Sequence, residues 1–299
     1  MTDDGGWHLA VDPPVLLPDR KATFTLTFTP TRDLDSRGVS AAVRCIERYR
    51  YDETETSMGA DGKTTSRSVT RTVEDELHRA DFALAGPGRL AAGQTQTWTF
   101  AMDMPGLGPA TFEGEELRCD WIVEAKVDLP MALDERFATH VRVAQPTALL
   151  EAGVVDTGQY GLFDEAPSNV DAFPAQIRLE PVPICLGEAF SGRFTVQTAE
   201  PIEVQEVRLE LRVHARVTHG GGHQEEILVQ HGRLQADGNR FGGEFAVHPF
   251  AADAVDAWLP SIDLPHGTAR GMFHIILARS WAPDIHYVRD VALATTRVL

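Results

Sequence analysis

The sequence predicts an all-β protein built from two antiparallel β-sandwich domains in tandem. Three observations support this prediction. Apolar and polar residues alternate along many segments, turn-forming residues separate those segments, and the order of segments in the first half of the chain recurs in the second half. Alternation with a period of two is typical of strands that bury one face in a core. Helical periodicity is limited to 251–259, which is compatible with a turn or one short helix.

In the first half, the predicted strands cover 22–28, 39–51, 98–105, 117–130 and 134–143. The alternation is clearest in the fourth of these segments, whose apolar phase consists of Leu117, Cys119, Trp121, Val123, Ala125 and Val127. We therefore expect a long strand with one face in a core and the other face toward water or a second layer. Trp121 and Trp98 lie on the apolar phase, so both are predicted to anchor the core.

A hairpin is predicted to follow the strand at 39–51, because Asp61-Gly62 is a turn signal between alternating residues. A two-residue turn at this position places Asp52 opposite Arg71, Arg48 opposite Asp75, and Ile46 opposite Leu77. Opposite charges across two of these pairs support the register, since such pairs contribute about 0.2–1 kcal/mol each. Glu47 would lie opposite Glu76 in the same register and argues against it.

The second half repeats the first in the same order. Its predicted strands cover 192–198, 204–217, 245–250, 261–265, 271–283 and 284–293. Between the halves, the alternation is lost and Gly, Pro, Ala and Asp are frequent, as in interdomain connections. We therefore predict an N-terminal sandwich at 1–145, a connection at 146–175 that packs on the domains through its apolar residues, and a C-terminal sandwich at 176–299.

Composition restricts the partners. The chain has 27 basic and 44 acidic residues, giving a formal net charge of -17. Such a charge repels phosphate backbones and anionic lipid, so we expect no nucleic-acid partner and favour basic protein partners. No apolar run exceeds four residues, which excludes a membrane-spanning helix, and the acidic N-terminus does not predict a secretory signal.

The three cysteines, Cys45, Cys119 and Cys185, are far apart in the sequence and odd in number. A disulfide framework needs a dense, even set, so we predict free thiols and a reducing cytoplasm. Cys45 and Cys119 fall on the apolar phase of their segments, where a thiol behaves as a small hydrophobe.

Two groups of residues imitate binding motifs. Gly62-Lys63-Thr64 matches the end of a phosphate-binding loop, but Ser57 stands where that loop needs its first glycine, and the flanks predict a hairpin. His219 and His223 bracket three glycines, and His231 follows. If the glycines form a hairpin loop, the two imidazoles lie opposite each other and offer ligands for zinc or nickel. A glycine-rich tip fixes ligand geometry poorly, so we predict no functional metal site and no cofactor.

No serine or cysteine lies in a recognisable nucleophile context, so no catalytic residue is predicted. Trp7, Trp258 and Trp281 lie outside the clear strand patterns. They fit either a surface binding site or, as we favour, cover for the ends of the sandwiches.

Each half of the chain resembles an arrestin-type domain, and the likeness is closest to bacterial arrestin-like proteins of the sporulation-control type. It covers roughly 20–299 and rests on short hydrophobic motifs: Phe24–Phe28, the strand at 39–51, Met102–Pro105, Thr111-Phe112-Glu113-Gly114, Trp121, Ala125, Asp128 and Pro130, and more loosely Phe194, Leu209–Val213, Pro265 and Ile275–Ala278. The resemblance implies two immunoglobulin-like sandwiches and a non-catalytic adaptor or scaffold. The phosphate-sensing charged clusters of animal arrestins have no match that we can assign here, so that role is not carried over.

The function predicted from the sequence is therefore a non-catalytic intracellular adaptor that binds proteins through sandwich edges, loops and the cradle between the two domains. The same open edges are compatible with a homo-oligomer. Two alternatives remain open: a small-ligand or carbohydrate-binding module, for which no aromatic stripe is evident, and a metal-dependent enzyme centred on His219, His223 and His231.

Overall fold

The protein is described from a computed structural model of the 299-residue chain. The described residues are all except 1–5, 59–63, 107, 152–174, 198–203, 219–222, 232–235, 238–239, 248–257, 280–283 and 298–299. The chain forms two compact units. The N-terminal unit comprises Met1–Phe112 and Leu117–Ala144, and the C-terminal unit comprises Glu113–Glu116 and Gln145–Leu299.

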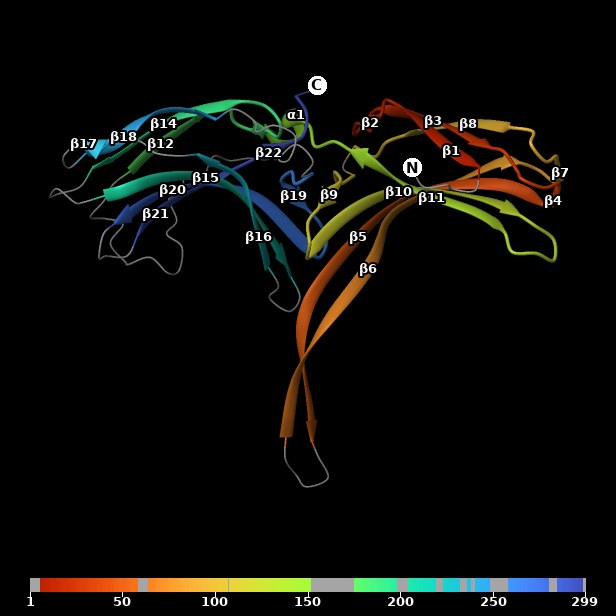
Figure 1. The fold of residues 1–299 in the computed structure, drawn as a ribbon, viewed down its shortest axis with the longest axis horizontal. Coiled ribbons are helices and arrows are strands. Elements are labelled where there is room, and N and C mark those ends of the chain that lie inside the picture. The colour runs from red at the N-terminus through yellow and green to blue at the C-terminus, as the bar shows by residue number, and fades with distance from the viewer. Residues whose placement is uncertain are drawn as a thin grey trace. The chain divides into compact units, whose positions relative to one another are not determined.

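The predicted all-β class is confirmed, since the described residues are almost all in strands (Figure 1). The one helix among them is α1 (Thr147–Glu151). Its neighbours at 152–174, which include most of the predicted connection, lie outside the described residues. The predicted turn or short helix at 251–259 also lies mostly outside them, and Trp258 and Leu259 at its end are not helical.

The N-terminal unit contains a three-stranded sheet in the order β1-β3-β8 and a larger sheet in the order β2-β11-β10-β5-β6, with β9 beside β10. The strands are β1 (Trp7–Asp12), β2 (Val15–Leu16), β3 (Lys21–Phe28), β5 (Gly38–Met58), β6 (Thr64–Ala85), β8 (Gln96–Asp103), β9 (Phe112–Glu113), β10 (Leu117–Asp128) and β11 (Glu135–Val143). A small separate pair is formed by β4 (Leu34–Ser36) and β7 (Gly88–Leu90).

The core of this unit is made by the apolar phases that the sequence predicts. Trp121 is fully buried on β10, and its Nε1 donates a hydrogen bond of 2.9 Å to the carbonyl oxygen of Pro109. Phe24 on β3 stacks on Phe100 of β8, with ring centroids 5.0 Å apart. Burying such a side chain stabilises the folded state by about 1.5–3 kcal/mol, and this burial holds the two sheets together.

The C-terminal unit repeats this plan with a four-stranded sheet, β12-β14-β18-β17, and a five-stranded sheet, β16-β15-β20-β19, in which β21 pairs with β20. The strands are β12 (Ala175–Glu180), β14 (Phe190–Gln197), β15 (Val204–Val217), β16 (His223–His231), β17 (Ala236–Asp237), β18 (Arg240–Val247), β19 (Ile262–Asp263), β20 (Gly267–Arg279) and β21 (Ile285–Val291). A short parallel pair joins β13 (Ile184–Cys185) to β22 (Leu293–Ala294).

The predicted register of the β5–β6 hairpin is wrong by one residue. The structure pairs Tyr51 with Arg71, Arg48 with Glu74, and Ile46 with Glu76. The register already differs at the far end of the hairpin, where Met58 pairs with Thr64, so five residues and not two separate the last paired positions. A bulge between Cys45 and Ile46 adds one residue to β6, and from Cys45, which pairs with His78, to Ser40 the predicted register holds. Asp52 accordingly accepts a 2.7 Å hydrogen bond from the Thr70 hydroxyl and does not lie opposite Arg71.

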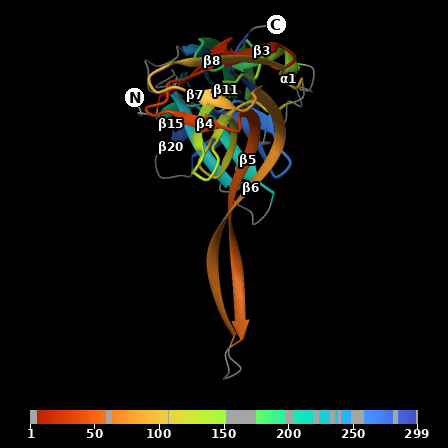
Figure 2. The same cartoon turned by 90° about the vertical axis from the view of Figure 1, so that its right-hand side faces the viewer.

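The hairpin is also longer than the sheet that contains it. β10 pairs with β5 only from Gly38 to Tyr49, whereas β5 and β6 continue to pair with each other as far as Met58 and Thr64. Residues 50–58 and 64–72 therefore form a two-stranded projection, which we call the arm (Figures 1 and 2).

All three cysteines are free thiols in the structure and are buried. The Sγ atoms of Cys45 and Cys119 are 3.5 Å apart on neighbouring strands, and their mutual hydrogen bond and burial raise the pKa of the Cys119 thiol. Burial also raises the pKa of Cys185 to about 11. A buried thiol with a raised pKa is a poor nucleophile, so neither Cys119 nor Cys185 is arranged for catalysis.

Candidate protein-binding surfaces

The outer face of the larger sheet in the N-terminal unit carries a connected network of charged side chains. At its centre is Asp120 on β10, whose side chain is only 2% exposed. Arg48 Nη1 lies 3.1 Å from Asp120 Oδ2, and Arg118 Nη2 and His140 Nδ1 lie 3.4 and 3.6 Å from Oδ1. A carboxylate at this depth is tolerated because cationic and polar partners surround it.

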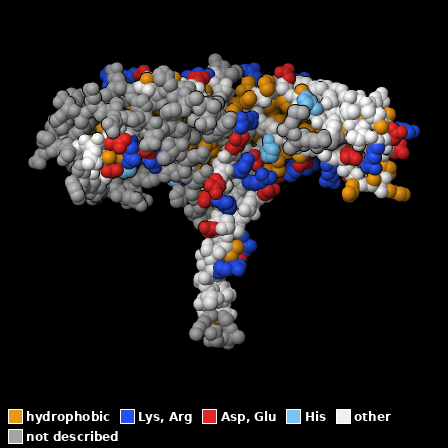
Figure 3. Space-filling view, in the orientation of Figure 1, with side chains coloured by type: hydrophobic (Ala, Val, Ile, Leu, Met, Phe, Trp, Pro, Cys, Tyr) orange, Lys and Arg blue, Asp and Glu red, His pale blue; other side chains and the backbone are white. Residues whose placement is uncertain are grey.

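Arg44 is the centre of a second charged cluster on this face, which spans three strands. Its Nη1 donates a 2.7 Å hydrogen bond to Glu124 on β10, and its Nε donates one to Glu76 on β6. These two bonds, with Glu76 the stronger influence, raise the pKa of Arg44. Charges of both signs thus alternate over this face near the base of the arm (Figure 3).

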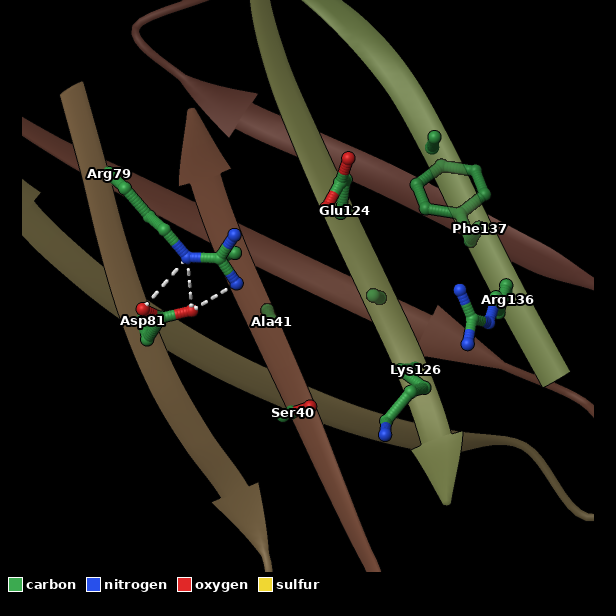
Figure 4. A pocket seen from close by; sticks show the side chains of 11 residues that line it. Ser40, Ala41, Arg79, Asp81, Glu124, Lys126, Arg136 and Phe137 are labelled. Carbon is green, nitrogen blue, oxygen red and sulfur yellow. Dashed lines mark hydrogen bonds and ion pairs between the residues drawn. The ribbon is translucent and has the colours of Figure 1, made fainter. Parts of the chain in front are cut away.

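A shallow groove of about 640 Å³ lies on the same face (Figure 4). Ser40, Ala42 and Ala138 are among the small residues that line it, and charged side chains from three strands stand around them: Arg79, Asp81, Glu124, Lys126 and Arg136.

The charges around the groove already have partners. Arg79 Nε donates to both carboxylate oxygens of Asp81 at 3.0 Å, and this lowers the pKa of Asp81. Lys126 and Arg136 each lie 3.6 Å from Asp134, whose pKa is lowered chiefly by a hydrogen bond from the Leu129 backbone N–H. Among the described residues that line the groove, Ser40 carries the one hydroxyl group. The charged and small side chains that line this groove are suited to polar contacts.

A second groove, of about 500 Å³, lies between β6 and β8. These strands are the outer edges of the two sheets in the N-terminal unit, and neither pairs on its outer side with any strand of the described chain. Five apolar side chains line the groove, and Phe82 packs on Phe100 with ring centroids 4.6 Å apart. The apolar lining residues are Phe82, Ala83, Leu84, Trp98 and Phe100. Unpaired strand edges can accept a strand from another protein, and the apolar side chains beside them can bind alternate residues of that strand.

The loop between β10 and β11 exposes two large apolar side chains. Leu133 is 91% exposed, and Met131 is fully exposed with a positive φ of 57°. Two neighbouring side chains make a small patch, far below the several hundred Å² that would mark an interface on its own.

The C-terminal unit buries a polar pair of its own. Glu210 on β15 and His274 on β20 are directly paired across the strands and are 3% and 1% exposed. Arg212 Nε donates a 2.8 Å hydrogen bond to Glu210. The arginine compensates the buried carboxylate, so the arrangement has a structural explanation.

The predicted histidine site is only partly described. His219 lies outside the described residues, and the backbones of His223 and His231 form the two ends of β16. The β15–β16 register pairs His223 with Arg216, so the expected cross-strand pairing of His223 with His219 is wrong at His223. Among the described residues, no group of three or more His, Cys, Asp or Glu side chains is arranged to hold a metal.

The remaining candidate residues from the sequence analysis are parts of the fold wherever the structure describes them. Thr64 begins β6, whereas Gly62 and Lys63 lie outside the described residues. Trp7 is buried and stacks on Phe28 with ring centroids 4.2 Å apart, so it belongs to the core. Trp258 is half-buried, and its carbonyl oxygen accepts a hydrogen bond from the Glu113 N–H within the C-terminal unit. Trp281 lies outside the described residues.

Sequence reasoning missed the buried carboxylates Asp120, Glu210 and Glu47. Asp120 and Glu210 occupy the polar phase of their strands, which predicts exposure, and only tertiary packing buries them. Glu47 is different: it interrupts the apolar phase of β5 between Cys45 and Tyr49 and is fully buried. A charged residue at a core position is a signal that could have been used.

The geometry agrees with the comparison of the sequence with known families. Residues 14–149 match the family described as arrestin (or S-antigen), N-terminal domain. The match covers most of the N-terminal unit and less than half of the chain, and it supports an arrestin-like family. No curated protein matches the chain. None of the helices among the described residues is long and apolar enough to cross a membrane.

Proposed function

We propose that the protein is a non-catalytic adaptor that binds an extended segment of a partner protein along β8, beside the β6–β8 groove. One observation carries the proposal: two unpaired strand edges flank a groove lined by aromatic side chains. Backbone hydrogen bonds to such an edge provide affinity for any extended chain, and the apolar pocket beside it provides selectivity for alternate side chains.

The proposal includes the finer points of the sequence interpretation. The protein would be a cytoplasmic, bacterial arrestin-like protein of the sporulation-control type, with domains at 1–145 and 176–299 and a connection at 146–175. The net charge of -17 would favour basic partners and accelerate their association at low salt. The arrestin family match supports the adaptor role in general terms.

The test is site-specific photocrosslinking in cells. The photoreactive residue p-benzoyl-phenylalanine replaces Thr99, which is exposed on β8. The matched control places it at Ala10, which is exposed on β1, the opposite edge of the same three-stranded sheet. The proposal predicts a protein adduct at Thr99 that is absent at Ala10.

Adducts of equal yield at both positions, or at neither, would contradict binding at the β8 edge. Measured turnover of a small molecule by the purified protein would contradict the non-catalytic role. Repeating the experiment at high salt tests the electrostatic part, because screening should reduce the yield with a basic partner.

A further inference from the structure

The arm is an unusual feature because little of it is packed against the rest of its own unit. Of its 18 residues, only Arg50, Tyr51, Glu55 and Val69 are even partly buried, and Met58 is 78% exposed. An isolated two-stranded hairpin is marginally stable in water. An additional strand beside the arm would stabilise it.

The two faces of the arm differ in chemistry. One face carries ion pairs that hold the hairpin register, since Arg71 Nε lies 3.1 Å from Glu53 and Arg67 Nη2 lies 3.4 Å from Glu55. The opposite face is dominated by hydroxyl groups and consists of Arg50, Asp52, Thr54, Thr56, Met58, Thr64, Ser66, Ser68, Thr70 and Thr72. In Figure 3 the far part of the described arm is drawn without charged side chains, whereas charges of both signs lie nearer its base.

The arm also has no net charge, in contrast to the whole chain. Three arginines balance three acidic residues: Arg50, Arg67 and Arg71 against Asp52, Glu53 and Glu55. The full chain carries -17, so two copies repel each other over most of their surfaces. The arm is a part through which two copies can meet without that repulsion. The features that usually prevent edge pairing, such as proline, lysine or a bulge, are absent from 50–58 and 64–72.

From these observations we infer that the arm of one chain pairs with the arm of a second copy through their β6 edges, antiparallel and centred on Ser68. In this two-fold arrangement Ser68 meets Ser68, Ser66 meets Thr70, and Thr64 meets Thr72. Hydroxyl residues directly opposite each other are a favourable cross-strand combination. On the other face, Arg67 lies opposite Val69 and Arg71 opposite Thr65, so no like charges oppose each other.

The corresponding pairing of the β5 edges is less favourable. Centred on Thr54, it would place Glu53 opposite Glu55 twice, and like charges directly opposite destabilise a sheet. The sequence of the arm therefore distinguishes its two edges and selects β6. The resulting four-stranded sheet has the same surface on both copies, as a closed dimer requires.

The test is a disulfide trap at the two-fold axis. In the full chain, Ser68→Cys places two thiols across the axis with Cβ atoms about 5 Å apart, within reach of a disulfide after small adjustment. The control is Thr54→Cys, directly opposite Ser68 in the same arm and on the same face. Its two copies would lie three strand spacings apart, about 14 Å, which no disulfide spans. The native cysteines are buried and do not compete.

With copper-phenanthroline as oxidant, the inference predicts covalent dimers for Ser68→Cys and only background for Thr54→Cys. Sedimentation equilibrium provides the second measurement: Ser68→Asp should raise the dimer dissociation constant about 2- to 5-fold. Thr54→Asp should leave it unchanged, and an equimolar mixture of Ser68→Asp and Ser68→Lys should restore it. A wild-type chain that stays monomeric at all soluble concentrations, or equal cross-linking of the two cysteine variants, would overturn the inference. The proposed adaptor role does not depend on either result.

Discussion

The two ends of the β5–β6 hairpin differ in what surrounds them. From Gly38 to Tyr49, β5 lies between β6 and β10, and its apolar side chains, such as Val43, are fully buried. From Arg50 to Met58, the same strand has β6 as its one partner among the described strands, and most of its side chains are exposed. The comparison shows that one strand can contribute side chains to the hydrophobic core along one half and expose them to solvent or to a partner along the other half.

The difference also determines what fixes the register. In the sheet, burial decides it, because a shift of one residue would turn the whole apolar phase toward water. In the arm, polar pairs such as Asp52–Thr70 and Arg71–Glu53 fix the register of the two strands. The bulge between Cys45 and Ile46 lies close to the boundary between these two regimes.

The largest expected effect is the loss of a core side chain of the sheet. Trp121→Ala should lower the free energy of unfolding by about 3–5 kcal/mol, because it leaves a cavity among fully buried residues and removes the bond to Pro109. Urea denaturation followed by circular dichroism measures the loss. A change below about 1 kcal/mol would mean that the N-terminal core is less tightly packed than described.

A smaller effect is expected at the charged face. Asp120→Asn should cost about 1–3 kcal/mol, since it leaves Arg48, Arg118 and His140 without the buried carboxylate they surround. Glu53→Gln in the arm, an exposed partner of Arg71, provides the control and should cost less than about 1 kcal/mol. Equal losses in the two variants would remove the distinction between sheet and arm.

Lowering the pH should destabilise the N-terminal unit through protonation of Asp134. Its pKa is lowered by the hydrogen bond from the Leu129 N–H, so the folded state binds this proton less readily than the unfolded state does. Its contribution to stability is therefore present above about pH 4 and is lost as the pH falls through its folded value. Urea midpoints between pH 5 and pH 2 should fall less steeply for Asp134→Asn than for the wild type. Identical slopes would show that this bond does not stabilise the fold.

The smallest expected effect is in the arm itself. Thr56→Ala removes an exposed hydroxyl opposite Ser66 and should change the free energy of unfolding by less than about 0.5 kcal/mol. Thermal unfolding of the isolated variant tests this against Trp121→Ala under the same conditions. A loss comparable to that of the core variant would show that the arm is part of the folding unit.

The strands and their buried phases could be predicted because alternation reports local burial directly. Residues such as Trp121 and Cys119 lie where the pattern places them. The bulge at Cys45/Ile46 could not be predicted, because it depends on how β5 accommodates both β6 and β10. The burial of Asp120 also depends on side chains from other strands, and the sequence alone does not bring Arg48 and His140 to it.

The sequence predicts the kind of binding surface, a free strand edge, but not which edge carries a groove. Open sandwiches predict free strand edges, but the groove between β6 and β8 depends on Phe82 and Trp98 coming together from segments distant in sequence. The length of the arm was missed because the predicted strand ended at Tyr51, whereas β5 continues to Met58. Alternation fails as a signal where both faces of a strand are exposed.

Hydrogen exchange tests most directly whether partners bind at the β8 edge. Amide exchange is measured first for the protein alone and then after addition of the partner recovered in the Thr99 photo-adduct. Exchange in peptides from Gln96–Asp103 is compared with exchange in peptides from Trp7–Asp12. New protection of Gln96–Asp103 with unchanged exchange at Trp7–Asp12 is the predicted result, because an added strand protects the amides of the edge it joins. Protection confined to Trp7–Asp12, or absent from both strands, would contradict the account.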